Sequence, residues 1–221
     1  MRLVVFDVDG TISDSQAHIS HAMAIGFETA GLAPLPTSQV LTIVGLSLPE
    51  AVARLVPDQP QDVQDAIVEG YKASYRSARA ASPAPLYPGA KALLERLARR
   101  DDLVLAVATG KSRRGLRALI EHHGLGGYFL SLQTADDHPS KPHPSMLHAA
   151  LADTGAQEQG AVMIGDTSFD IEMGRAAGFR TIGVSWGYHP VQALAQAGAE
   201  QIVESFDALE QALTQDIGEV A

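Results

Sequence analysis

Cysteine is absent from the 221-residue chain, which excludes disulfide bonds, thiolate metal sites and a cysteine nucleophile. Basic residues are few, since 16 Lys and Arg face 26 Asp and Glu and leave a net charge of -10. Nucleic-acid backbones select basic surfaces, so we expect no nucleic-acid partner. No apolar run reaches the length of a membrane span, and Met1 leads at once into a predicted strand. We therefore expect a cytoplasmic protein with no membrane partner.

The rest of the composition is that of a globular protein, with 46% hydrophobic residues and enough length for one α/β domain with a smaller insert. After a first strand that ends near Phe6, the second half of the chain alternates between strand-like and helix-like segments. Strands are predicted at 103–107, 129–132, 161–164, 181–184 and 202–203, and helices at 90–99, 113–123, 145–153, 169–177, 191–197 and 206–214. This alternation predicts a doubly wound parallel sheet, a Rossmann-like α/β core with helices on both faces.

Residues 15–80 lack this alternation and are predicted to be helical throughout. Apolar residues recur at helical spacing over 15–30 and again over 58–80, with short segments near 38–44 and 49–56 between them. Asp14 or Ser15 is a plausible cap of the first helix. The proline-rich stretch 81–89 cannot lie inside a helix and is predicted to return the chain to the core. The predicted domains are therefore a core of 1–14 and 82–221 and an inserted helical bundle of 15–81.

The first predicted strand ends in Asp7-Val8-Asp9-Gly10-Thr11. Side chains alternate along an extended chain, so Asp7 and Asp9 can point the same way. Gly10 lets the backbone approach a bound anion closely. Two acids and a glycine at the carboxyl end of a buried strand favour a metal and a phosphate, although an isolated Asp-x-Asp-Gly is more often an ordinary turn.

Three further loops follow predicted strands and should meet at the same sheet edge. They carry Thr109-Gly110, then Lys141 held between prolines, then Asp166 and Asp170. Taken singly, these residues are typical of a turn, a solvated lysine and a helix cap. Four carboxylates around one point would repel one another unless cations were present. Lys141 and a hard cation with oxygen ligands, most naturally Mg²⁺, would resolve that repulsion.

In this order and spacing, the four motifs resemble those of the haloacid dehalogenase-like superfamily, and the resemblance spans essentially the whole chain. The helical insert resembles the cap domain of the subgroup that includes phosphoglycolate phosphatases and β-phosphoglucomutases. The resemblance implies a Mg²⁺-dependent phosphatase that acts on a small phosphorylated metabolite, with phosphoglycolate as the best single candidate.

By the same resemblance, Asp7 is the nucleophile that forms an aspartyl-phosphate. Asp9 protonates the leaving alkoxide and then activates water. The metal ligands are the carboxylates of Asp7 and Asp166 and the carbonyl of Asp9. Asp170 supports the metal through water or orients Lys141.

The resemblance also assigns the phosphate site. Thr109, Gly110 and the amide of Gly10 bind phosphoryl oxygens, and Lys141 neutralises the charge shared by nucleophile and phosphate. Thr109 and Lys141 are therefore counted with Asp7 and Asp9 among the catalytic residues.

The cap should exclude water and contact the leaving group. By family position, the first cap helix around His18 and the loop with Gly45 and Ser47 should face the site, although a histidine on an amphipathic helix is more often a half-buried surface residue. Thr11 and residues 46–48 depart from the mutase pattern and favour hydrolysis. A phosphosugar mutase, a pyrophosphatase and a catalytically silent binding protein stay open as alternatives. A monomer or a homodimer is expected.

Overall fold

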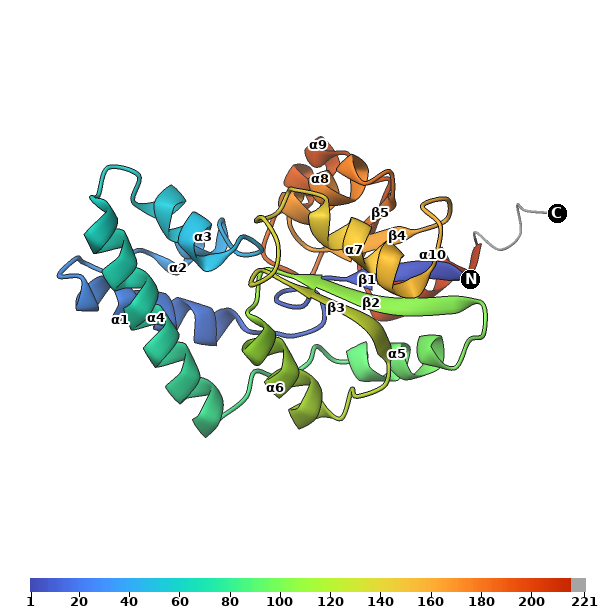
Figure 1. The fold of residues 1–221 in the computed structure, drawn as a ribbon, viewed down its shortest axis with the longest axis horizontal. Coiled ribbons are helices and arrows are strands. Elements are labelled where there is room, and N and C mark those ends of the chain that lie inside the picture. The colour runs from blue at the N-terminus through green and yellow to red at the C-terminus, as the bar shows by residue number, and fades with distance from the viewer. Residues whose placement is uncertain (216–221) are drawn as a thin grey trace.

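The central element of the structure is a six-stranded parallel sheet, shown in a computed structural model that describes residues 1–215, the side chains of Ala81 and Gln215 excepted (Figure 1). The strand order is β3-β2-β1-β4-β5-β6. The strands are β1 (Arg2–Phe6), β2 (Leu103–Thr109), β3 (Phe129–Thr134), β4 (Val162–Gly165), β5 (Arg180–Val184) and β6 (Gln201–Val203). The predicted doubly wound α/β fold is thereby confirmed. Successive strands are added on one side of β1 up to β3 and on its other side from β4 onward.

Strand β1 lies in the middle of this sheet, which suits its sequence because four of its five residues are apolar and Val4, Val5 and Phe6 are β-branched or aromatic. Val5 is fully buried and lies opposite Ala106 of β2 and Met163 of β4. Because all neighbouring strands are parallel, the residues that follow β1, β2 and β4 emerge at one edge of the sheet.

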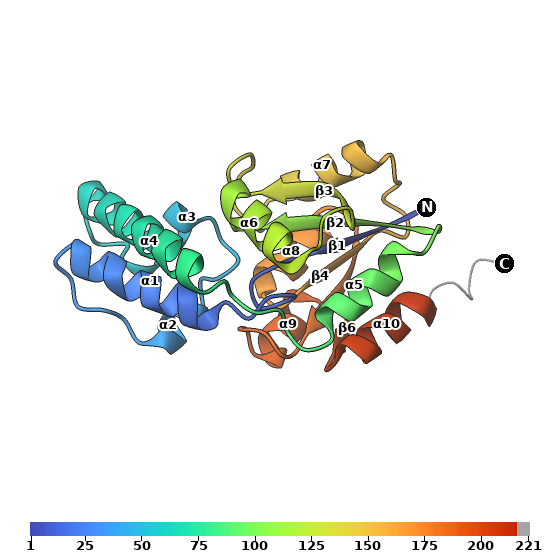
Figure 2. The same cartoon turned by 90° about the horizontal axis from the view of Figure 1, so that it is seen from below.

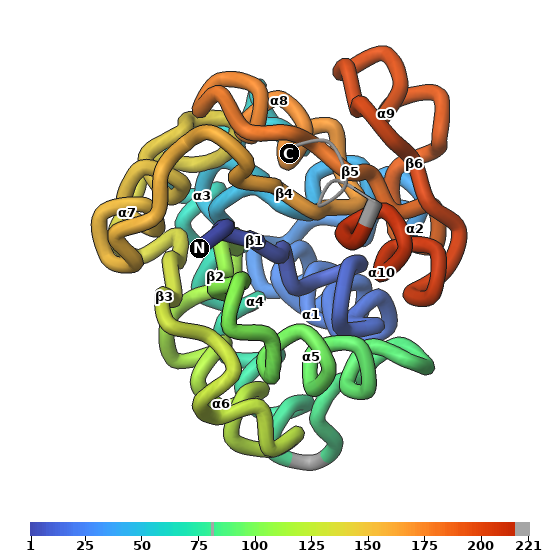
Figure 3. Tube along the Cα trace, turned by 90° about the vertical axis from the view of Figure 1, so that its right-hand side faces the viewer, coloured from blue at the N-terminus to red at the C-terminus, as the bar shows by residue number. Residues whose placement is uncertain are grey.

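Helices cover both faces of the sheet (Figure 3). One face packs against α5 (Ala90–Ala98), α6 (Arg113–His123) and α10 (Phe206–Gln215), and the other against α7 (Ser145–Thr154) and α8 (Ser168–Ala176). Helix α9 (Val191–Ala197) packs against α8. Alternate residues of β1 supply the two cores, with Val4 and Phe6 on one face and Leu3 and Val5 on the other.

Four helices between β1 and α5 form a separate layer at the carboxyl edge of the sheet, joined to the core by two chain segments (Figure 2). They are α1 (Gln16–Thr29), α2 (Thr37–Leu41), α3 (Leu48–Leu55) and α4 (Gln61–Ala81). Helix α1 packs along α4, and Gly26 allows this close approach because a Cβ there would lie 2.7 Å from the Ile67 carbonyl oxygen. The layer has its own apolar core, which includes Met23, Phe27 and Ile67.

Several expected boundaries differ from the observed ones. Helix α4 begins at Gln61 rather than near Asp58, because Pro60 stands in extended conformation immediately before it. Ser15 occupies the N-cap position of α1, but its side chain makes no capping bond. Within residues 1–215, no helix has both the length and the apolar character needed to cross a membrane.

Candidate active site

Four charged side chains from separate parts of the chain meet at the carboxyl edge of the sheet: Asp7 after β1, Lys141 before α7, Asp166 after β4 and Asp170 in α8. All four are at most 1% exposed. Lys141 Nζ lies 2.7 Å from Asp7 Oδ1 and 2.6 Å from Asp170 Oδ1. The structure therefore brings together the lysine and three of the four acids that the sequence predicted to converge, the carboxylate of Asp9 being the exception.

The second carboxylate oxygen of Asp7 is buried, and among the described residues it has no hydrogen-bond partner. Burial raises the pKa of Asp7 to about 7, with a further increase from the charge of Asp170, against the lowering effect of Lys141. Burial, followed by the nearby charges of Asp7 and Asp170, likewise raises the pKa of Asp166 well above its usual value. A buried carboxylate oxygen without a partner is suited to bind a cation or to attack an electrophile.

One oxygen from each of Asp7, Asp166 and Asp170 lies within 4.8 Å of the others, which is close enough to share a metal ion. With Lys141, the cluster holds three acids against one base, so a bound cation would relieve its excess negative charge. Carboxylate oxygens are hard ligands, which suit Mg²⁺ or a similar ion. The residues present therefore fit a metal ion.

Asp170 both caps a helix and holds Lys141. The Thr167 side chain accepts a bond from the Asp170 amide, and Asp170 Oδ2 accepts one from the Thr167 amide at 3.1 Å, forming a capping box at the start of α8. Helix capping was the alternative to a functional role here. Because Asp170 Oδ1 binds Lys141, the structure supports both roles.

Asp166 accepts two hydrogen bonds and packs closely against a glycine. Thr11 Oγ1 donates to its Oδ1 at 2.8 Å, and the Tyr188 amide donates to its Oδ2 at 2.9 Å. A Cβ on Gly187 would lie 2.1 Å from that of Asp166, so only glycine fits there. The sequence does not predict this contact, because nothing in the pattern of residues 186–188 indicates that a backbone amide faces a carboxylate.

Gly10 serves the site differently from what the sequence predicted. Its amide donates to the Ser13 carbonyl at 2.9 Å, so in this structure the amide is not available to a phosphate oxygen. Gly10 instead has a φ of 90°, and a Cβ there would lie 2.2 Å from Asp166 Oδ2. The glycine is therefore required by the tight turn and by the closeness of Asp166.

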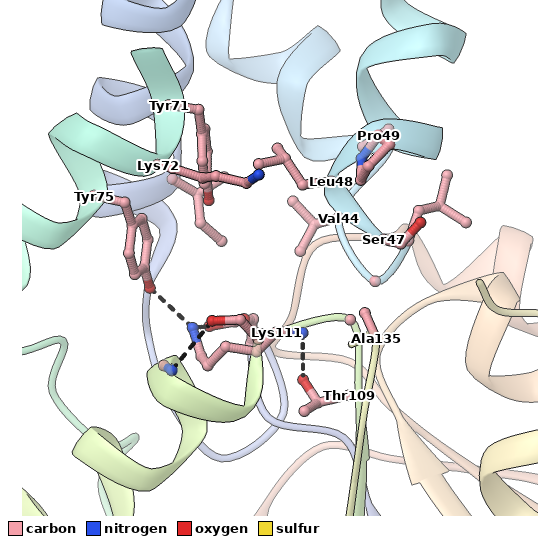
Figure 4. Close-up of a pocket in the computed structure, with 18 of the residues that line it drawn as sticks. Val44, Ser47, Leu48, Pro49, Tyr71, Lys72, Tyr75, Thr109, Lys111 and Ala135 are labelled. Carbon is pink, nitrogen blue, oxygen red and sulfur yellow. Dashed lines mark hydrogen bonds and ion pairs between the residues drawn. The ribbon is translucent and has the colours of Figure 1, made fainter. Parts of the chain in front are cut away.

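The carboxylate of Asp9 lies outside the three-acid cluster and is bound by two other side chains. Lys111 Nζ lies 2.8 Å from Asp9 Oδ1, and the Ser15 hydroxyl donates to the same oxygen. Lys111 also donates to the Tyr75 hydroxyl of α4 at 2.9 Å (Figure 4). Burial by itself would lower the pKa of Lys111, but Asp9 and Tyr75 outweigh it and raise the pKa above its ordinary value.

Sequence reasoning did not assign a role to Lys111. The residue stands two positions after Thr109, in a loop already identified, and that position was the only available signal. Its partners come from the end of β1 and from α4, so the contact depends on tertiary structure.

Thr109 is the last residue of β2, and Gly110 follows it against the loop between α2 and α3. The Thr109 hydroxyl oxygen accepts from the Lys111 amide at 3.2 Å, so its own proton is available to a ligand. A Cβ on Gly110 would lie 2.5 Å from the Leu46 carbonyl oxygen. The Ser47 amide donates to Ser140 Oγ at 2.8 Å, so the loop with Gly45 and Ser47 contacts the core.

A cavity of about 480 Å³ lies between the sheet edge and the inserted helices (Figure 4). The core lines it with Asp7, Asp9, Thr109 and Lys111. The insert lines it with residues 43–49 and with side chains of α1 and α4. His18 is not among its lining residues. Its Nε2 pairs with the Ser82 carbonyl, and it lines a much smaller cavity beside the chain segment that leads back to the core.

The chain matches the model of a known protein family over most of its length. Residues 4–184 match the family model described as haloacid dehalogenase-like hydrolase. The chain belongs to this family.

Two relatives and one solved structure are similar to the chain over most of its length. Over 210 residues the chain is 33% identical to "Probable phosphatase IndB" of Dickeya dadantii, covering 92% of this chain and 90% of that protein. It is 32% identical over 216 residues to a phosphoglycolate phosphatase of Rhodospirillum rubrum, covering 94% and 89%. Among solved structures, a predicted phosphatase of Clostridium acetobutylicum superposes with a TM-score of 0.86 at 25% identity, covering 97% and 98%.

Proposed function

We propose that the chain is a Mg²⁺-dependent enzyme that hydrolyses a small phosphate monoester through a phosphoryl group carried on Asp7. It is a phosphatase of the haloacid dehalogenase-like family, as its relatives over nine-tenths of its length indicate. The observation that carries the mechanism is the partnerless, buried Oδ2 of Asp7 beside Lys141 and two further acids. Phosphoglycolate is the reference substrate because several relatives carry that name.

In the first step Asp7 Oδ2 attacks phosphorus while Lys141 holds Oδ1 in place, 2.7 Å away. The Thr109 hydroxyl and the Gly110 backbone bind phosphoryl oxygens, and Lys141 offsets the negative charge that develops between nucleophile and phosphate. Asp9 donates a proton to the leaving oxygen. It then takes a proton from the water that hydrolyses the acyl phosphate and regenerates Asp7.

The carboxylates of Asp7 and Asp166, with the carbonyl of Asp9, would hold Mg²⁺, and Asp170 stands beside them. When bound, the ion supplies positive charge that masks the phosphate and allows an anionic nucleophile to approach.

Release of inorganic phosphate from a panel of metabolite phosphates tests this function, measured with Mg²⁺ and with EDTA. We expect Mg²⁺-dependent release, and a loss of at least about a thousandfold in kcat for Asp7→Asn because the nucleophile is removed. Asp14→Asn, an exposed acid near the same loop, is the matched control and should keep its activity. Isomerised sugar phosphate without phosphate release would favour a mutase, and full activity of Asp7→Asn would refute the assignment.

The domain division, the cellular location and the oligomeric state belong to the same proposal. The division into a core of 1–14 and 82–221 and a cap of 15–81 is supported by the separate apolar core of the inserted helices. Cytoplasmic location and a monomeric or homodimeric state stay predictions.

A further inference from the structure

The cavity is large for the reference substrate. Its 480 Å³ lies within the range of pockets that hold drug-sized ligands, about 300–1,000 Å³. Glycolate, with a skeleton of two carbons, would occupy only a small part of the space beyond the phosphate. Unfilled space around a leaving group offers no contacts that could distinguish substrates.

The walls of the cavity on the cap side are mostly apolar. Ile19, Met23 and Val44 are at most 6% exposed and lie beside Leu48 and the rings of Tyr71 and Tyr75. The two tyrosine rings stack with centroids 5.5 Å apart and form one wall, while Val44 and Leu48 form the opposite one (Figure 4). Such a surface gains free energy by burying carbon, not by binding a second carboxylate close to the phosphate.

Cationic side chains also line the cavity. Arg76 and Arg79 of α4 and Arg114 of α6 line the cavity, and none of them has an acidic partner among the described residues. Arg76 and Arg114 are exposed. Lys72 is paired with Glu69, and the Asp136 carboxylate accepts from the Arg113 amide. The mouth of the cavity therefore offers unpaired guanidinium groups although the whole chain is strongly acidic.

We propose that the leaving group of the natural substrate has an apolar body several carbons long and an anionic group at its far end. The body occupies the space between the Tyr71–Tyr75 wall and the Val44–Leu48 wall, and the anion meets Arg76 and Arg114 at the mouth. This inference rests on the proposed phosphatase function and gives that function a substrate class other than phosphoglycolate.

Four synthetic monoesters test the two features separately: n-propyl phosphate, n-hexyl phosphate, 3-(phosphonooxy)propanoate and 6-(phosphonooxy)hexanoate. All are primary alkyl esters, so the leaving groups differ little in basicity. We expect kcat/KM to rise at least about tenfold from propyl to hexyl, because three more methylenes are buried. The hexanoate should be the best of the four and should exceed phosphoglycolate. Equal rates for propyl and hexyl, or a preference for phosphoglycolate, would overturn the proposal.

Variants locate the two contacts. Leu48→Gln keeps the side-chain volume but makes the wall polar, and it should reduce the ratio of hexyl to propyl hydrolysis severalfold. The double variant Arg76→Gln with Arg114→Gln should bring the ratio of hexanoate to hexyl hydrolysis close to one. Arg117→Gln removes an exposed charge from α6 outside the cavity lining, and it should leave both ratios unchanged. An equal effect of Arg117→Gln would show general charge steering instead of a contact.

A small activated substrate, acetyl phosphate, separates this inference from the function on which it rests. Mg²⁺-dependent hydrolysis of acetyl phosphate with no preference among the four esters would refute the substrate class alone. No hydrolysis of any of the six compounds, which are the four esters, phosphoglycolate and acetyl phosphate, would refute the phosphatase function.

Discussion

Among the described residues, Lys141 is the one cation that contacts Asp7 and Asp170, and it is itself fully enclosed. Burial by itself would lower its pKa, but the charges of Asp170 and Asp7 outweigh burial and hold the pKa above its ordinary value. Removing one partner from a buried ion pair leaves the other charge uncompensated, which costs more than the pair contributes. The lysine is therefore a structural requirement, in addition to the catalytic role proposed for it.

Lys141→Met should accordingly destabilise the metal-free protein by roughly 3–5 kcal/mol. Urea unfolding in EDTA measures the loss, and Mg²⁺ should recover part of it by binding the folded state. Lys91→Met, at an exposed lysine of α5, is the control and should change stability by less than about 1 kcal/mol. A similar small change for Lys141→Met would mean that the acids of the site are not ionised.

The raised pKa of Asp7 predicts that the stability of the metal-free protein depends on pH. Its pKa rises from 3.8 to about 7 on folding, so the folded state binds the proton more tightly than the unfolded state. Both states are protonated well below pH 4, and stability falls as pH rises from about 4 to about 7. Each tenfold difference in proton affinity corresponds to about 1.4 kcal/mol.

Asp7→Asn removes this titration and keeps an oxygen for Lys141. In EDTA, we expect the variant to lose less stability than the native chain between pH 5 and pH 7.5, as measured by thermal or urea unfolding. Parallel pH profiles for the two proteins would contradict the raised pKa.

Gly10 and Gly31 provide a matched pair for backbone strain, since both have positive φ. A Cβ on Gly10 meets Asp166, whereas one on Gly31 meets no described atom within 4 Å. We expect Gly31→Ala to cost about 1 kcal/mol from backbone conformation alone. Gly10→Ala should cost roughly 3 kcal/mol and weaken Mg²⁺ binding, because Asp166 must move. Equal losses for both variants, in unfolding and in metal titration, would show that contact with Asp166 is unimportant.

At the scale of elements, the contact between the 43–48 loop and the end of β2 sets how closely the cap covers the site. A Cβ on Gly110 would come within 2.6 Å of the carbonyl oxygens of Gly45 and Leu46. Backbone cannot yield as a flexible side chain can, so a methyl group there must push the loop away from Thr109.

Gly110→Ala should therefore speed amide hydrogen exchange in residues 43–48 and lower kcat/KM, because the site is less well closed. The control is Gly126→Ala, since a Cβ on Gly126 meets no described atom within 4 Å. If exchange in the loop and kcat/KM both stay at native values, the loop does not close onto Gly110.

For the whole molecule, the sequence predicted the sheet and the convergence of Asp7, Lys141, Asp166 and Asp170. Parallel strands end at one edge, so residues that follow them are neighbours regardless of separation along the chain. The roles of Lys111 and Tyr188 could not be predicted in this way. Lys111 meets Tyr75 only because the inserted helices fold over the edge, and Tyr188 acts through its amide, which no side-chain pattern reveals.

The chemical claim at the centre of this account is that Asp7 carries the phosphoryl group during turnover. Asp9→Asn should slow hydrolysis of that intermediate, so it is the variant in which to trap it. The variant is mixed with acetyl phosphate and Mg²⁺, quenched in acid, digested and sequenced by mass spectrometry. We predict one Mg²⁺-dependent phosphoryl group on Asp7 and none in Asp7→Asn. Phosphoryl transfer to another residue, or phosphate release by Asp7→Asn at the native rate, would contradict the account.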